Sequence, residues 1–556
     1  MLNQKIANFK QSFFMLFIFC TTILLLVVFS GLGRLSIDLI GSFDRSFSGL
    51  VFSGILFCTV LATVFAFFIP LNGWIEAGLL LVGVVSFFKF KVYDLFYESI
   101  VKQQLFFAAI FMIICFFGSF SPFILDHFGY YVPTIKWLSE VGLTQGISNL
   151  DLVLGQMSFW HILQALFSNF SDPFLRLNSV LLVAYLIYII EKKVWILLLF
   201  LPVLFLFCQS PSPDLAVFIF SLVILNEIFT KNKYFHFVFA FSIFIFCIKP
   251  TMIWVPVFAF FYALFYGGNK SSFWLSGSAV LLLFLFKNYW CFGYPIFPVA
   301  IGDIGLSYKP HPKILEISSE LAIRKTYDMQ YTFAEIKAFS KNEAIQNWLF
   351  LDGLKSKINL LFVCCILFFG VFAIRSKSRL VQMVFIAVLI KSIAILVFSA
   401  QYRFFIDVFF VVGFIAFRNT FVTKFSSPIF GIFTFFAATF FIFPQVLTTY
   451  IPSFRVASFM KGFELKQILK PADYQHLKYS KHKIGNLDFF VVKDYSYSFD
   501  TPIPAISPEF LKENAEAGVF PQKMGQKLRD GFYWKKMNDQ EKASLNVTIQ
   551  SIKRKK

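Results

Sequence analysis

Charged and aromatic residues follow directly after an apolar run in the first quarter of the chain. Within SPFILDHFGYYVPTIKWLSEVGLTQG, residues 121–146, Asp126 is followed by Tyr130, Lys136 and Trp137. A carboxylate there could accept a proton as a general base, and the rings could pack against a sugar or a lipid. A structural interpretation is equally open, because Asp caps helices and aromatic residues are common where helices leave a membrane.

The spacing of these residues indicates how they could share one surface. A helix over residues 124–140 would place four of them on one stripe: Asp126, Tyr130, Thr134 and Trp137. Lys136 would pair with Glu140 on another face, and Pro133 would kink or break the helix because proline lacks the backbone N–H. The stripe is a candidate catalytic and substrate-binding surface, and Lys136 is a candidate substrate-binding residue.

Two further charged residues lie at the ends of apolar runs. Asp214 follows Pro213 at the start of one run, where both residue types also favour a helix N-terminus for purely structural reasons. Lys249 ends another run, on the side assigned below to the exterior, where lysine is uncommon. It needs an anionic partner such as phosphate or carboxylate, unless its long stem simply carries the amine to the interface. Both are candidate substrate-binding residues.

Arg403 begins an apolar run, and Asp407 follows at a spacing that would let the two pair on one helix. The pair could be structural, or the planar guanidinium could bind a phosphate. Lys391 lies inside another apolar run, where an ionisable residue is a functional candidate by default and snorkelling to the interface is the alternative.

The stretch KNYWCFGYPIFP, residues 287–298, opens a second long polar segment. Its prolines cannot continue the preceding helix. Its aromatic residues would form part of a membrane-boundary belt or line a wall for a polyprenyl chain. Asn288 and Tyr294 are candidate substrate-binding residues.

Common nucleotide and hydrolase motifs are missing from the sequence. It contains no Walker A loop, Gly-rich dinucleotide fingerprint, HExxH or GxSxG motif, and its six histidines show no metal-binding spacing. Chemistry driven by a cytosolic nucleotide is therefore unsupported.

The composition predicts an integral membrane protein. The 556 residues are 58% hydrophobic and 15% charged, with a mean hydropathy of +0.72, whereas a soluble domain is about 25% charged. The net charge of +19 is explained by cytoplasmic anchoring and contact with anionic membrane lipids, so we expect no nucleic-acid partner. The apolar run near the N-terminus predicts a retained first helix, since no cleavage site follows it.

Apolar runs and polar interruptions predict an all-α polytopic membrane domain, residues 1–450, with about 13–14 transmembrane helices. The candidate spans are 12–32, 48–69, 72–88, 105–122, 173–190, 194–208, 214–229, 235–248, 252–267, 272–286, 358–374, 380–399, 404–417 and 428–450. Two long polar loops, 123–172 and 287–356, interrupt them. Residues 451–556 form a soluble tail with strands and turns, which predicts a small α+β domain.

Basic residues in the short loops predict the orientation. Short loops rich in Lys and Arg alternate with loops that lack them, and basic short loops stay in the cytoplasm. This rule places both long loops and the tail on the outer face. Fourteen crossings would leave the N-terminus outside, against Lys5 and Lys10. We therefore prefer a re-entrant or interfacial segment at 72–88, which contains Glu76, so that thirteen crossings leave the N-terminus inside.

The architecture resembles the GT-C superfamily of integral membrane glycosyltransferases, and more closely a family of bacterial multi-pass proteins described only as predicted membrane proteins. The residues that carry the closer resemblance are Asp126, Tyr130, Thr134-Ile135-Lys136-Trp137, Glu140, Gly142, Gly146, Ser212-Pro213-Asp214, Lys249, Asn288, Gly293-Tyr294-Pro295, Pro298 and Arg403, and the tail segment FDTPIPAISP with Asp500, Pro502 and Pro504. The chain departs from that pattern in having Tyr130-Tyr131 where a Tyr-His pair is usual. Its tail also lacks the usual Trp and Cys pair, so we expect no disulfide there.

The resemblance to GT-C enzymes implies a function. It implies an inverting transferase of the bacterial cytoplasmic membrane that moves a sugar from a polyprenyl-phosphate-linked donor to a cell-envelope glycan or lipid on the outer face. Asp126 would be the general base, and Arg403, helped by Lys249, would hold the donor phosphate. Asp214 would orient the acceptor or hold a divalent metal ion together with Asp126, an alternative that the sequence leaves open.

Two other classes of protein fit a chain with many spans. An O-antigen polymerase or ligase would use similar lipids, but it usually has arginine-rich outer loops, whereas the loops here are mixed in charge. A polysaccharide or lipid transporter or flippase predicts an internal repeat and polar residues near mid-membrane. The sequence shows no clear repeat, and Lys391 is the strongest residue of that kind.

Overall fold

The computed structural model describes residues 15–267, 273–451, 460–468, 470–472, 474 and 478–552. Lys5 and Lys10, on which the predicted side of the N-terminus depends, lie outside the described residues. In chain order the helices up to Tyr450 are α2 (Met15–Ile40), α3 (Phe47–Ala66), α4 (Gly73–Lys89), α5 (Val92–Ile100), α6 (Gln104–Gly118), α7 (Val132–Glu140), α8 (Phe159–Leu166), α9 (Leu177–Lys192), α10 (Leu201–Leu204), α11 (Pro213–Phe229), α12 (Phe235–Ile248), α13 (Trp254–Tyr266), α14 (Trp274–Phe292), α15 (Pro312–Thr326), α16 (Phe333–Ala338), α17 (Lys341–Leu349), α18 (Leu354–Arg375), α19 (Arg379–Phe398), α20 (Ile406–Phe417), α21 (Thr423–Ile442) and α22 (Pro444–Tyr450).

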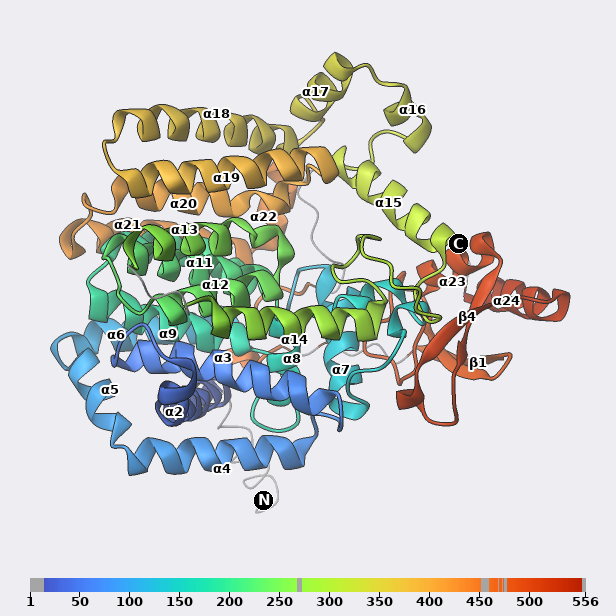
Figure 1. Ribbon diagram of the computed structural model, residues 1–556, viewed down its shortest axis with the longest axis horizontal. Helices are drawn as coiled ribbons and strands as arrows, with labels where there is room; N and C mark the ends of the chain where they lie inside the picture. Colours follow the sequence, from blue (N-terminus) through green and yellow to red (C-terminus); the bar gives the residue numbers. More distant parts are fainter. Residues whose placement is uncertain are drawn as a thin grey trace.

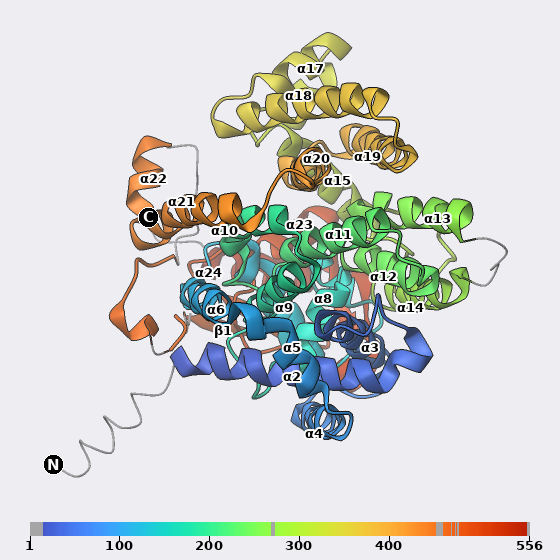
Figure 2. The same ribbon diagram turned by 90° about the vertical axis from the view of Figure 1, so that its left-hand side faces the viewer.

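The helices form a bundle with distinct ends. Helices α4, α19 and α20 run in roughly parallel directions across Figure 1, with α4 at the opposite edge from the other two, and are seen end-on in Figure 2. The strands and helices α15–α17, α23 and α24 gather at one end, which we call the loop face. The opposite end, which we call the basic end, carries the helix junctions that include Lys192, Arg375 and Lys377.

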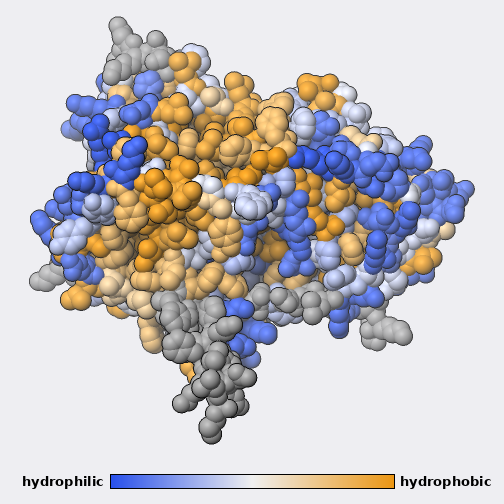
Figure 3. Space-filling view, turned by 90° about the horizontal axis from the view of Figure 1, so that it is seen from below, coloured by the Kyte–Doolittle hydropathy of each residue, from blue (hydrophilic) through white to orange (hydrophobic). Residues whose placement is uncertain are grey.

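Seven stretches of the described residues are helical, long and apolar enough to cross a membrane: Phe17–Ile40, Phe47–Ala66, Val92–Gly118, Trp274–Phe292, Leu354–Arg375, Arg379–Phe398 and Phe425–Ile442. Four shorter apolar helical stretches accompany them, and the 13–14 predicted crossings require shorter helices of this kind. The sides of α9 and α11 are buried almost throughout, so protein rather than lipid surrounds these two helices. Figure 3 shows an apolar zone of surface between hydrophilic zones at the two ends. The protein is therefore a mostly helical polytopic membrane protein.

Helix α4 covers residues 73–89 and is not among the stretches long and apolar enough to cross a membrane, so the re-entrant or interfacial segment at 72–88 stays a prediction. The helix itself is unbroken (Figure 1). Glu76 does not prevent this, because its buried carboxylate accepts hydrogen bonds from the backbone N–H groups of Asn169 at 3.0 Å and Ser171 at 2.8 Å. An acid with its charge satisfied in this way is compatible with a full-length helix.

The tail is a small α+β region, as predicted. Strands β1 (Tyr479–Ile484) and β2 (Leu487–Val492) form one antiparallel hairpin, in which Tyr479 faces Val492. Strands β3 (Val519–Lys523) and β4 (Phe532–Lys536) form a second antiparallel pair. Helix α23 (Pro508–Ala517) links the two pairs, and α24 (Asp539–Ile552) follows the last strand.

Both long loops and the tail meet at the loop face. The Asn149 side chain of the first loop donates hydrogen bonds to the carbonyls of Tyr308 in the second loop, at 2.6 Å, and Phe532 in the tail, at 3.4 Å. Gly146 has a φ of +59°, and a Cβ there would lie 2.2 Å from the Phe532 carbonyl oxygen. Only glycine fits both the conformation and the space, so this residue lets three distant segments pack together.

Candidate functional site

Asp126 is positioned by a short irregular helix. It directly precedes the π-helical turn η2 (His127–Tyr131), which continues into α7. The prediction placed a break at Pro133, but this proline lies in the first turn of α7, where a backbone N–H is not needed. The change of helical pitch therefore comes before the proline, and it alters the predicted stripe.

Arg403 pairs with Asp126, across 277 residues of sequence. The guanidinium Nη1 lies 3.1 Å from Asp126 Oδ2, and the two side chains are 40% and 32% exposed. The predicted pairing of Arg403 with Asp407 is wrong. Arg403 lies in the 3-10 turn η8 (Tyr402–Phe404), before α20 begins at Ile406, so the four-residue spacing does not fall on one helix.

Asp407 belongs to a separate, buried ion pair. Its carboxylate accepts a hydrogen bond from Trp254 Nε1 at 2.9 Å and pairs with Lys391, the lysine that lies within an apolar run. The Lys391 and Asp407 side chains are 1% and 3% exposed. Lys391 therefore does not snorkel to the interface; instead it neutralises an acid inside the bundle.

Asp214 and Lys249 form a second pair beside Arg403. Asp214 lies in the first turn of α11 and Lys249 directly follows α12, and their side chains form an ion pair. The Lys249 amine also lies 3.4 Å from the carbonyl oxygen of Arg403 and 5.4 Å from the centre of the Phe404 ring. The structure thus brings together four of the charged residues singled out in the sequence.

Tyr130 joins these residues, as its position in the sequence suggested. Burial raises the pKa of Tyr130, and the negative charges of Asp126 and Asp214 raise it further, while Arg403 opposes them. The phenol therefore stays protonated near neutral pH and can donate a hydrogen bond. Its ring contacts Tyr131, which in turn packs against His161 of α8 with ring centres 4.8 Å apart.

Lys325 of α15 is a charged neighbour that sequence reasoning missed. Partial desolvation lowers the pKa of Lys325, and the positive charge of Arg403 lowers it further, while Asp126 and Glu513 oppose these effects. The signal in the sequence was the pair Arg324-Lys325, two basic residues in a loop predicted to be external. We call Asp126, Asp214, Lys249, Lys325 and Arg403 the charge cluster.

The tail and the first loop contribute carboxyl groups near the cluster, which the sequence did not indicate. Burial raises the pKa of Glu513 on α23 to about 8, and the charges of Asp151 and Glu509 add to this effect. Burial raises the pKa of Asp151 to about 6, against the effect of hydrogen bonds from Ser507. Near neutral pH, Glu513 is therefore mostly uncharged.

The other predicted site residues hold the loops together. Lys136 pairs with Asp500 of the tail at 2.9 Å rather than with Glu140, beside a cavity of about 370 Å³. Trp137 is buried and donates a hydrogen bond to Thr144 at 2.9 Å. The remaining two serve the second loop: Asn288 is buried and donates to the Pro295 carbonyl at 2.6 Å, and Tyr294 packs against Phe292 with ring centres 5.3 Å apart.

The donor set at the cluster does not fit a metal ion. Asp126 and Asp214 each pair with a basic side chain, so a metal ion would have to compete with that side chain for the carboxylate oxygens. Within the described ranges, no three His, Cys, Asp or Glu residues group closely enough to hold a metal. We therefore assign no chemical step to a metal ion.

One family model matches most of the chain. The chain belongs to the family described as "Domain of unknown function (DUF8201)", which matches residues 15–410. That range contains the whole charge cluster and ends before the tail. No curated protein and no solved structure matches the chain.

Proposed function

We propose that the protein is a GT-C-type membrane glycosyltransferase. It would transfer a sugar from a polyprenyl-phosphate-linked donor to a glycan or lipid acceptor of the cell envelope. The observation that carries the proposal is the solvent-accessible Asp126–Arg403 pair at the end of an apolar helix bundle. A base and a phosphate-binding cation placed side by side at a membrane boundary suit a lipid-linked sugar.

In this mechanism Asp126 accepts the proton of the acceptor hydroxyl. The hydroxyl oxygen then attacks the anomeric carbon from the face opposite the phosphate. The bond between the anomeric carbon and the phosphate oxygen breaks, and the bonding electrons leave with the phosphate. The configuration at the anomeric carbon is therefore inverted. Arg403 stabilises the negative charge that develops on the leaving oxygen.

The guanidinium of Arg403 can hold both groups at once. Only Nη1 hydrogen-bonds to Asp126, and within the described residues the buried Nε has no hydrogen-bond partner. A guanidinium offers five N–H donors in a plane, so phosphate can bind while the carboxylate stays paired. Arg403 would then fix the distance between the base and the donor.

The remaining cluster residues have positioning roles in this proposal. Lys249 pairs with Asp214 and lies against the Arg403 backbone, so the pair holds the arginine segment between α11 and α12. Asp214 and the protonated Tyr130 are placed to orient hydroxyl groups of the substrates. We place the loop face on the outer side of a bacterial cytoplasmic membrane, because the short loops at the basic end carry the lysines and arginines.

Replacing the base tests the proposal. Asp126→Asn keeps the size of the side chain and removes the proton acceptor, so transfer should fall by about 10²–10⁴-fold while folding is preserved. The measurement is the mass-spectrometric glycan profile of cells in which the variant replaces the native gene, at equal protein level. Asp352→Asn, an exposed acid of the second loop, is the matched control. An unchanged glycan profile in Asp126→Asn cells would refute the assignment.

A further inference from the structure

Lys325 is held in place by hydrogen bonds at the end of α15. The Ser399 hydroxyl donates to the Ala322 carbonyl at 3.3 Å and lies 3.4 Å from the Thr326 hydroxyl. Trp348 Nε1 also donates to the Ala400 carbonyl at 2.9 Å. These contacts attach the last turn of α15 to the segment that leads directly to Arg403, and they keep Lys325 near enough for the charge of the guanidinium to act on its amine.

The cluster contains one positive charge more than its acids neutralise. Asp126 neutralises Arg403, and Asp214 neutralises Lys249. Across the residues that the structure describes, no carboxylate lies within ion-pair distance of Lys325. Lys325 therefore adds a positive charge that has no ion-pair partner among the described residues, while the charges of Asp126 and Glu513 act on it from beyond ion-pair distance.

Two cations side by side repel each other, and an anion that contacts both relieves the repulsion. Lys325 is exposed, and Arg403 is 40% exposed, so an anion can reach both from solvent. The structural alternative is that Lys325 only complements the negative carbonyl end of α15, where it lies in the last turn. That alternative explains the position in the helix, but it does not explain the placement beside a second cation.

We propose that Lys325 is a second phosphate-binding residue, which binds the phosphate ester of the lipid-linked donor together with Arg403. This inference rests on the proposed function and adds a substrate-binding residue to it. The two side chains have complementary properties, because the ammonium acts as a compact point charge and the guanidinium as a planar fork. The phosphate would lie between α15 of the second loop and the segment that precedes α20.

Binding of a defined lipid tests the proposal on the full-length protein. The probes are a synthetic polyprenyl phosphoglucose and the matching polyprenyl glucoside without phosphate, each measured in phosphatidylcholine nanodiscs. The variants are Lys325→Gln, Lys325→Arg and, as the matched control, Lys341→Gln, an exposed lysine of the same loop. Melting temperatures of all variants establish that they are folded.

We expect Lys325→Gln to bind the phosphoglucose about ten- to a hundredfold more weakly, the range typical of a lost charged hydrogen bond. Lys325→Arg should retain most of the affinity, Lys341→Gln all of it, and the phosphate-free glucoside should bind weakly in every case. Equal affinity in Lys325→Gln and Lys341→Gln would overturn the proposal, as would equal binding of both probes by the wild type.

Competition and transfer measurements distinguish a donor-phosphate site from a general lipid-headgroup site and from a site without catalysis. Displacement of the probe by an equal concentration of phosphatidylglycerol would indicate a general headgroup site and would overturn the assignment to the donor. Displacement only by excess inorganic phosphate would support a phosphate subsite. Glucose transfer from the phosphoglucose is measured separately. Lys325-dependent binding without any transfer would refute the proposed function, whereas the assignment of the phosphate site would stand.

Discussion

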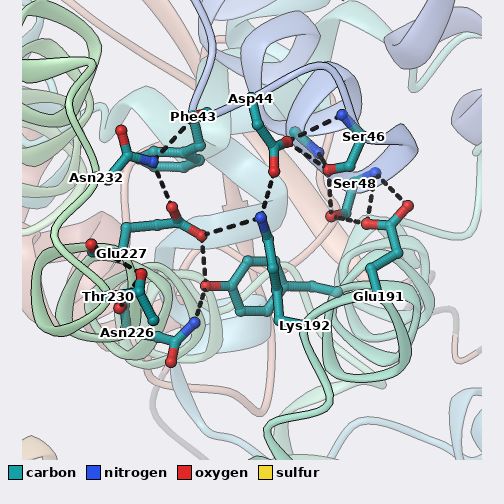
Figure 4. A network of polar contacts seen from close by, with 12 residues as sticks. Phe43, Asp44, Ser46, Ser48, Glu191, Lys192, Asn226, Glu227, Thr230 and Asn232 are labelled. Carbon is teal, nitrogen blue, oxygen red and sulfur yellow. Dashed lines mark hydrogen bonds and ion pairs between the residues drawn. The ribbon is translucent and has the colours of Figure 1, made fainter.

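Two charged networks lie at opposite ends of the helix bundle, and they differ in how completely their groups are bonded. At the basic end, Lys192 lies between Asp44 and Glu227, as Figure 4 shows. Tyr188 donates to Glu227 at 2.8 Å, and Asn232 bonds to both Glu227 and the Phe43 carbonyl. This network joins the loop between α2 and α3 to the ends of α9 and α11.

Beside it, Glu191 accepts hydrogen bonds from the start of α3. The backbone N–H groups of Phe47 and Ser48 lie 3.0 and 3.2 Å from its oxygens, and Ser99 donates at 2.5 Å. The acids of this end therefore have several donors each. A network with its groups satisfied in this way rigidifies the fold and leaves little capacity to bind anything else.

The charge cluster at the loop face is different in this respect. The Arg403 guanidinium has a buried Nε with no partner in the described part of the chain, and Lys325 adds a charge that no acid there pairs with. The Asp126–Arg403 pair is 32% and 40% exposed and the Asp44–Lys192 pair at the other end is 31% and 26% exposed, so the two ends differ in unpaired groups more than in exposure. Charge near a membrane is therefore a poor marker of function by itself, and donors and charges without a partner are a better one.

The comparison first requires that the two ends face different compartments. Single cysteines at Glu140, Lys341 and Lys542 on the loop face, and at Lys377 on the basic end, occupy exposed positions. A membrane-impermeant maleimide added to intact cells should label the first three and not the fourth, an all-or-none difference. The native protein gives the background from its own cysteines. Labelling of Lys377→Cys alone would put the charge cluster on the cytoplasmic side and remove the basis for an outer-face enzyme.

A second test concerns the stability provided by the basic end. Glu227→Ala leaves Tyr188 and Asn232 without their buried acceptor, while Lys192 keeps Asp44, and the change should cost on the order of 2–4 kcal/mol. We expect a fall in the apparent melting temperature in detergent. Glu316→Ala, which breaks the exposed Lys313–Glu316 pair, is the control and should cost less than about 1 kcal/mol. A Glu227→Ala protein as stable as this control would contradict the structural role of the network.

The smallest expected effect is that of Arg403→Lys at the loop face. Lysine keeps the charge and the pairing with Asp126 but loses the planar fork, so transfer and donor affinity should each fall by about tenfold. The melting temperature should barely change, because the Asp126 pair is partly exposed. Arg375→Lys at the basic end controls for the substitution itself. Normal transfer and normal donor affinity in Arg403→Lys would show that the arginine serves the fold only.

Long-range pairing explains why the sequence identified candidates but not all of their partners. Asp214, Lys249 and Arg403 stood out because a charge beside an apolar run is costly to bury. The natural sequence-based partner for Arg403 was Asp407, since local spacing is all that a sequence displays. A turn before α20 broke that register, and the chain brought Asp126 from the first loop instead.

The motif residues of the first loop show the same limit. Lys136 and Trp137 had the composition of a binding surface, and in the structure they hold the loop to the tail and to itself, while Lys136 also lines a cavity. The tail segment FDTPIPAISP docks there through Phe499, whose ring stacks on Phe128 with centres 3.8 Å apart. Polar and aromatic residues serve interfaces between segments as readily as they serve ligands, and composition does not distinguish the two uses.

The sequence by itself determined the membrane class, the helical fold, the α+β tail and the location of the principal charged residues. Hydropathy and charge act through the free energy of transfer of each segment, which depends on composition alone. Only the tertiary structure decided which charges pair, that α4 is unbroken, and that α15 carries Lys325 to Arg403. These depend on contacts between segments that lie from 35 to 277 residues apart, and such contacts arise from how the helices pack rather than from any local pattern.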